Sequence, residues 1–112
     1  MQMTFDQVGD FKKVILVGRL DTAGVSRIEA RFAAGIAPGG KSTVIDLTGV
    51  EFLASLGVRM LISTARALSS KGGKLVMFGA NAAVSDTIEA MGFGEIVPVT
   101  ETEAEAVALL QA

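Results

Sequence analysis

The sequence contains no cysteine, histidine, tryptophan or tyrosine among its 112 residues. Without cysteine the chain has no disulfide, no thiolate nucleophile and no ligand for an iron–sulfur cluster. Without histidine as well, tetrahedral zinc sites, Ser-His-Asp triads and imidazole general bases lack their usual side chains. These absences disfavour most classes of enzyme, and we expect no catalytic residue, no metal site and no cofactor.

Clustered basic charge and long apolar runs are also missing. Ten Lys and Arg residues stand against twelve Asp and Glu residues, and the basic residues are dispersed, which disfavours nucleic acid as a partner. No apolar run approaches the ~18 residues that a membrane-spanning helix requires. The first ten residues include Asp6 and Asp10 and do not resemble a secretion signal. The sequence therefore predicts a soluble, cytoplasmic protein with no direct membrane insertion.

Half of the residues are hydrophobic, and the length suits one domain over residues 1–112. Alternation predicts an edge or half-buried strand over Met3–Val8, and a continuous apolar run predicts a central strand, covered on both faces, over Val14–Val17. A last strand over Ile96–Val99 belongs at an edge because Pro98 has no N–H to donate. Two more buried strands are expected over Thr43–Leu47 and Leu75–Phe78.

Apolar residues at helical spacing predict four helices: after Asp21, from Ser55, after Asn81, and after a capping box of Thr100 and Glu103. The third helix is expected to turn Met91 inward, and the fourth to carry Ala104, Val107 and Leu110 on one face. The glycine-rich segments 38–41 and 71–74 lack the spacing of a Walker loop and are assigned as helix ends and tight turns.

The resulting order of elements predicts an α/β fold: a mostly parallel or mixed sheet of about five strands with about four helices packed against it. In such sheets the functional surface lies at the carboxyl ends of the strands. Asp21, Thr22 and Ser55 fall on connections at that end. Asp46 lies within the predicted strand Thr43–Leu47, where its carboxylate should pair or face a loop, and a role in shaping the site is an open alternative.

Two motifs resemble the STAS family, which includes the anti-sigma-factor antagonists of bacterial partner-switching systems. The first is the segment from Val44 to Gly57, which reads VIDLTGVEFLASLG, and the second is Gly18-Arg19-Leu20-Asp21. The resemblance covers nearly the whole chain and implies a single STAS-like domain. It also implies a non-enzymatic regulator that binds a serine-kinase anti-sigma factor.

The family resemblance also implies a phosphoacceptor. In STAS antagonists a loop reading Asp-Ser-(Ser or Thr)-Gly opens the second helix, and its first hydroxyl is the phosphoacceptor; Ser55 and Gly57 match this pattern. Ala54 stands where the pattern has Asp, and Leu56 where it has a second hydroxyl. The implied cycle is binding to the kinase when Ser55 is unmodified, release on phosphorylation, and return through a phosphatase. The implied binding surface around Ser55 comprises Asp21, Thr22, Ala54, Leu56, Gly57 and Arg59.

Other interpretations remain open at this point. Ser55 is also suited to be an ordinary helix N-cap worth about 1 kcal/mol, and Asp21 is suited to start the first helix. Ala54 and Leu56 are also compatible with a constitutive STAS adaptor, such as the small cytoplasmic subunit of a lipid-transporting ABC complex. Binding of a nucleotide or small ligand rests on the breadth of the family rather than on residues of this chain.

Overall fold

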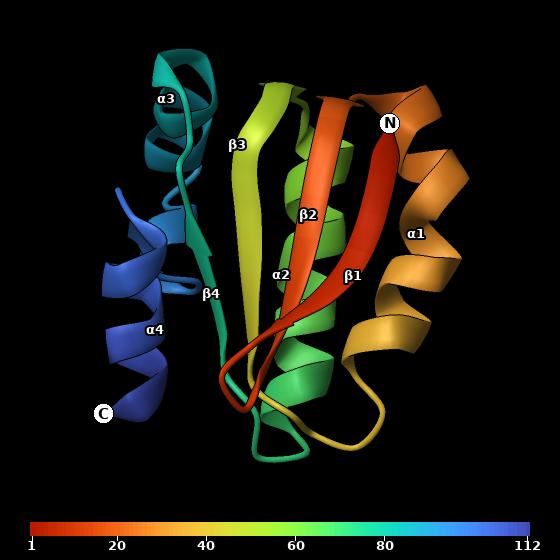
Figure 1. The fold of residues 1–112 in the computed structure, drawn as a ribbon. Helices are drawn as coiled ribbons and strands as arrows, with labels where there is room; N and C mark the ends of the chain where they lie inside the picture. The colour runs from red at the N-terminus through yellow and green to blue at the C-terminus, as the bar shows by residue number, and fades with distance from the viewer.

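The computed structural model describes all of residues 1–112, as a five-stranded mixed sheet flanked by helices (Figure 1). The sheet order follows the chain, with β1 antiparallel to β2 and the remaining neighbours parallel. This architecture confirms the predicted α/β fold. The strands are β1 (Gln2–Val8), β2 (Phe11–Leu20), β3 (Thr43–Leu53), β4 (Leu75–Phe78) and β5 (Val99–Thr100).

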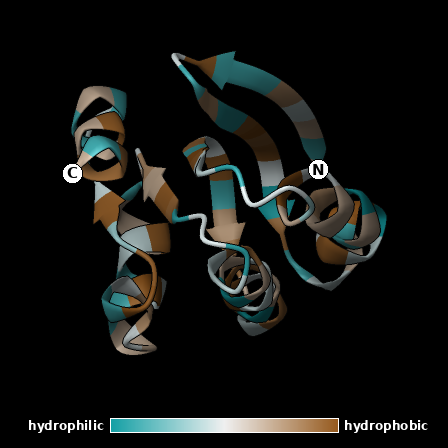
Figure 2. Cartoon of the chain, turned by 90° about the horizontal axis from the view of Figure 1, so that it is seen from below, coloured by the Kyte–Doolittle hydropathy of each residue, from teal (hydrophilic) through white to brown (hydrophobic).

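The helices cover the two faces of the sheet unequally. They are α1 (Thr22–Ile36), α2 (Ser55–Ser69), α3 (Ala82–Ala90) and α4 (Glu103–Gln111), with a 3₁₀ turn η1 (Phe93–Glu95) before β5. The main core of 21 buried residues lies between one face of the sheet and α1, α2, α3 and η1. A core of five buried residues joins α4 to the other face of β3 and β4 (Figure 2). None of the helices has the length and apolarity needed to cross a bilayer.

The position of β2 differs from the prediction. We expected the Val14–Val17 run to form a central strand covered on both faces, but β2 is second in the order and β3 is the middle strand. Val14 and Leu16 are fully buried, whereas Val17 on the opposite face is 43 % exposed. The reason is that α4 packs on β3 and β4 and leaves this face of β2 open. An apolar run alone does not reveal which neighbours cover it.

The strand β3 is six residues longer than predicted. The added stretch pairs with β2 from Gly49, opposite Val17, to Leu53, opposite Leu20, and the register between the two strands shifts twice. Gly49 and the polar residues of this stretch favour a loop locally, but the long β2 partner supplies hydrogen bonds that extend the strand. The extension carries the start of α2 to the end of β2.

Local predictions near the C-terminus also need correction. The capping box is formed by Thr102 and Glu105, two residues after the expected pair, because Thr100 belongs to β5. Met91 is 50 % exposed because α3 ends at Ala90 and the chain turns outward at Gly92, where φ is 64°. The last strand begins only at Val99, after η1, and it lies at the predicted edge of the sheet. In α4, Ala106 and Leu110 are buried, Val107 is half-buried and Ala104 is exposed.

Candidate functional site

The β2–α1 and β3–α2 connections lie against each other at the carboxyl end of the sheet. The backbone N–H of Ala54 donates a 2.9 Å hydrogen bond to the carbonyl oxygen of Leu20. Behind it, a Cβ atom on Gly57 would lie 3.0 Å from the same oxygen and 2.7 Å from a methyl carbon of Leu53. Gly57 therefore allows α2 to start this close to β2. The arrangement brings Ser55 beside Asp21, as their positions after parallel strands predict.

Ser55 is exposed and is the first residue of α2. Its assignment as the N-cap is wrong: the capping position is occupied by Ala54, with extended φ and ψ of −94° and 170°, and no side chain caps the helix. The Ser55 hydroxyl makes no hydrogen bond within the protein. The first N–H groups of α2 therefore have no capping side chain, and the hydroxyl beside them is free for chemistry.

Asp21 is tied into the fold as the N-cap of α1, which confirms its helix-start role. Its carboxylate accepts a 2.9 Å hydrogen bond from the N–H of Gly24 and lies 3.5 Å from Nε of Arg19. The Arg19 guanidinium in turn lies 4.6 Å from the ring centroid of Phe52. The Gly24 hydrogen bond, with help from Arg19, lowers the pKa of Asp21 below its ordinary value, although burial opposes the shift. Thr22 follows as the exposed first residue of α1.

The lowered pKa of Asp21 predicts a specific loss of stability in acid. Because the folded-state pKa lies below the unfolded one, the ionised carboxylate stabilises the fold above the unfolded pKa, and this contribution disappears as the pH falls through the folded pKa. Asn is also a good N-cap, so Asp21→Asn removes the charge and keeps the cap. We expect the wild type to melt at a higher temperature than Asp21→Asn at pH 7, and this difference in melting temperature to narrow as the pH falls below 3.8, the ordinary pKa of Asp. If the difference in melting temperature were the same at pH 7 and in acid, the lowered pKa of Asp21 would be wrong.

The remaining predicted residues lie along α2. Leu56 is 38 % exposed, and with Arg59 it lines a groove of about 410 Å³ between α1 and α2. The structure thus brings Asp21, Thr22, Ala54, Ser55 and Gly57 to one junction and sets Leu56 and Arg59 beside it. The two sequence motifs include Phe52 and Arg19 but predict no role for them; in the structure these side chains stack at the rim of the same junction. The only signal was an aromatic residue three positions before Ser55, in a stretch assigned as a loop.

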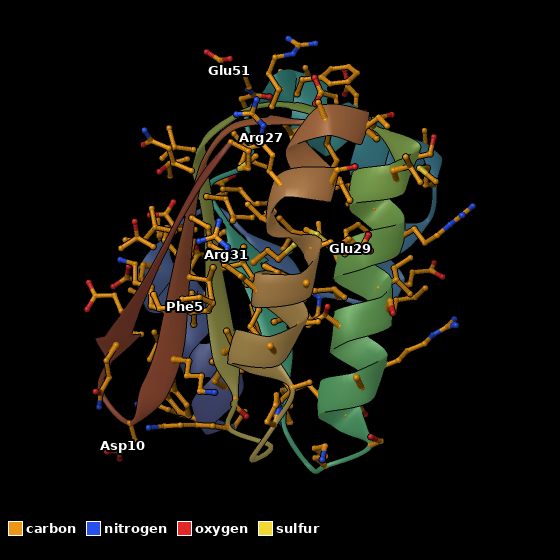
Figure 3. All side chains as sticks on the ribbon, turned by 90° about the vertical axis from the view of Figure 1, so that its right-hand side faces the viewer. Phe5, Asp10, Arg27, Glu29, Arg31 and Glu51 are labelled. Carbon is orange, nitrogen blue, oxygen red and sulfur yellow. The ribbon has the colours of Figure 1, made fainter.

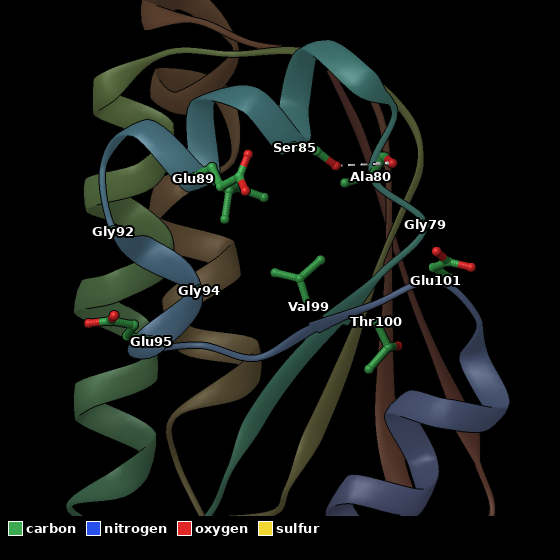
Figure 4. A pocket seen from close by; sticks show the side chains of 11 residues that line it. Gly79, Ala80, Ser85, Glu89, Gly92, Gly94, Glu95, Val99, Thr100 and Glu101 are labelled. Atoms are coloured by element: carbon green, nitrogen blue, oxygen red, sulfur yellow. Dashed lines mark hydrogen bonds between the residues drawn. The ribbon is translucent and has the colours of Figure 1, made fainter.

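The largest cavity is elsewhere. About 780 Å³ lies between α3, η1 and β5, lined by backbone at three glycines and by the side chains of Glu89, Glu95 and Glu101, among others (Figure 4). It contains none of the predicted site residues. Asp46 also stands apart from the site: its carboxylate accepts hydrogen bonds from the N–H and hydroxyl of Thr48, at 2.9 and 2.6 Å. This pairing satisfies the expectation for an acid within a buried strand.

Comparisons with known proteins agree with this architecture. The STAS domain profile matches residues 2–106. BtrV of Bordetella bronchiseptica, which is named as an anti-sigma factor antagonist, is 29 % identical over 96 % of this chain and 93 % of its own. An anti-sigma factor antagonist from Mycobacterium paratuberculosis superposes with a TM-score of 0.88 at 21 % identity, over 99 % of this chain and 94 % of its own. The phosphorylated form of SpoIIAA, a Bacillus cell fate determinant, superposes with a TM-score of 0.70 at 21 % identity, over 96 % of this chain and 97 % of its own. The chain belongs to the STAS domain family, among relatives of the anti-sigma factor antagonist type.

Proposed function

We propose that this chain is an anti-sigma factor antagonist that binds a serine-kinase anti-sigma factor and is released when Ser55 is phosphorylated. The observation that carries the proposal is the exposed, unbonded hydroxyl of Ser55 at the start of α2. Kinase and nucleotide supply the phosphoryl-transfer chemistry, and the chain is the protein substrate rather than an enzyme. A phosphatase restores the unmodified state.

The surroundings of Ser55 suit a phosphate without a change of fold. The N–H groups of the first turn of α2 have no capping side chain, and the positive end of the helix dipole points toward the hydroxyl. Arg59, one helical turn further on, is exposed and makes no ion pair. A phosphate adds about −1.5 to −2 charges, beside the carboxylate of Asp21. The modification therefore acts on the docked partner through charge and bulk.

The decisive experiment is phosphorylation with purified components. The protein is incubated with ATP, Mg²⁺ and each serine-kinase anti-sigma factor of its source organism, and intact mass spectrometry is used to detect one added phosphate. We expect a shift in the wild type, none in Ser55→Ala, and the full shift in the control Ser63→Ala, which removes another exposed serine of α2. A shift that persists in Ser55→Ala would place the phosphate elsewhere and refute the role of Ser55.

A second candidate is a constitutive STAS adaptor that docks on an ATPase without phosphorylation. It is favoured by Ala54 and by the exposed Leu56, which replace the acid and the second hydroxyl of the phosphoacceptor loop. The same experiment separates the two functions. Stable binding to an ATPase with no mass shift from any kinase supports the adaptor, whereas a Ser55-dependent shift supports the antagonist.

A further inference from the structure

One face of α2 carries a row of accessible residues that starts at Ser55. Ser55, Arg59, Ile62 and Arg66 are separated by four, three and four residues, which aligns them along one side of an α-helix. Ser55 and both arginines are exposed, and Ile62 is half-buried. These four residues, called the α2 stripe below, extend over about 16 Å.

The positive charge of the α2 stripe has no partner within the protein. The two ion pairs of the structure join Lys13 to Glu103 and Arg19 to Asp21. Glu29 lies on the side of α1 that faces α2 (Figure 3) and shares a groove with Arg59, yet makes no ion pair with it. Both arginines of the stripe are therefore available to acidic groups of another molecule.

An apolar groove runs beside the α2 stripe. Its volume is about 420 Å³, with Val58, Ile62 and Met91 as its apolar lining and Arg59 and Arg66 at its polar positions. Met91 is half exposed here, and the flexible, polarisable methionine side chain adapts well to a binding partner. A groove with an apolar floor and an arginine rim matches an amphipathic helix that carries acidic residues beside its apolar face.

We propose that the α2 stripe and its groove bind an acidic amphipathic helix of the anti-sigma factor. The inference rests on the proposed function. The assignment of the occupant rests on charge complementarity with the two free arginines and on continuity with Ser55, since a partner seated on Ser55 reaches Arg59 one helical turn away. A specific interface covers about 800 Å² on each partner, an area larger than one helical turn offers.

This geometry also gives release a physical cause. A phosphate on Ser55 lies at the N-terminal end of the α2 stripe. There it attracts the Arg59 guanidinium and draws it away from the acidic helix of the partner. The same phosphate repels the carboxylates of that helix at short range. Attraction within the chain and repulsion across the interface both favour dissociation.

The test compares two charge reversals in the full-length protein. Arg59→Glu/Arg66→Glu reverses the α2 stripe, and the control Arg27→Glu/Arg31→Glu makes the same charge change on the side of α1 facing β1 (Figure 3). Affinity for the purified kinase that binds the wild type is measured by calorimetry at low and high salt. We expect the stripe variant to bind at least about tenfold more weakly at low salt and to lose most of the salt dependence, with the control within about twofold of the wild type.

Each outcome decides a different point. If no kinase binds the wild type, the proposed function fails and this inference fails with it. If a kinase binds the wild type and the stripe variant equally, or if the control loses as much affinity as the stripe variant, only the inference fails. Circular dichroism verifies that both variants fold. If the stripe variant is unfolded, Arg59→Gln/Arg66→Gln, which removes charge without reversing it, decides by the same measurement.

Discussion

Replacing Gly24 by alanine is expected to destabilise the domain by about 3 kcal/mol, which is near the upper end of the usual cost of adding a carbon atom to a well-packed core. A Cβ atom at Gly24 would lie 2.0 Å from the carbonyl oxygen of Arg19 and 3.3 Å from Oδ1 of Asp21. Because the nearest obstacle is backbone, the first turn of α1 must move away from β2. The displacement would also disturb the hydrogen bond from the Gly24 N–H to Asp21. The expected fall in melting temperature is about 10 to 20 °C.

Gly35 on the same helix provides a matched control. A Cβ atom there would meet the ring of Phe5 at 2.3 Å, but that side chain is 45 % exposed and is able to swing aside. Alanine also gains about 1 kcal/mol of helix propensity over glycine at either position. We expect Gly35→Ala to change stability by less than about 1 kcal/mol. The chain lacks Trp and Tyr, so urea unfolding is followed by circular dichroism; equal losses at the two glycines would contradict the steric argument.

Leu20→Ala is the second substitution with a large expected effect, about 3 kcal/mol. Leu20 is fully buried at the end of β2, and its Cβ atom lies 3.1 Å from where a Cβ atom on Gly57 would stand. Its truncation leaves a cavity directly beneath the first turn of α2. Since the Leu20 carbonyl also accepts the hydrogen bond from the N–H of Ala54, we expect hydrogen exchange at the Ala54 amide to accelerate more than exchange in the middle of α2.

The control for Leu20→Ala is Leu56→Ala, at the same junction of β2 and α2. Leu56 is 38 % exposed on the first turn of α2, so its truncation removes little buried surface and should cost less than about 1 kcal/mol. Unfolding curves of the two variants measure the difference. If Leu56→Ala were as destabilising as Leu20→Ala, the assignment of Leu56 to the surface would be wrong.

Patterns within single elements predicted most of the fold. The helix at α2 was predicted from its first residue because five apolar residues recur on one side, and the edge position of β5 followed from the missing N–H of Pro98. Errors occurred where distant segments decide the local structure. The extension of β3 depends on its pairing with β2. The capping box of α4 lies two residues later than predicted because Thr100 is part of β5.

The amino-acid sequence by itself determined the order of the elements, the STAS family and the prediction of Ser55 as the modified residue, because periodicity and motifs are properties of neighbouring residues. Only the tertiary structure decided that Ala54 and not Ser55 occupies the N-cap position of α2, since this depends on where β3 ends against β2. Only the tertiary structure placed Met91 beside Arg59 and Arg66 to form a groove. Met91 directly follows α3, whereas the two arginines lie on α2, and their proximity arises from packing on a shared core, which no local pattern encodes.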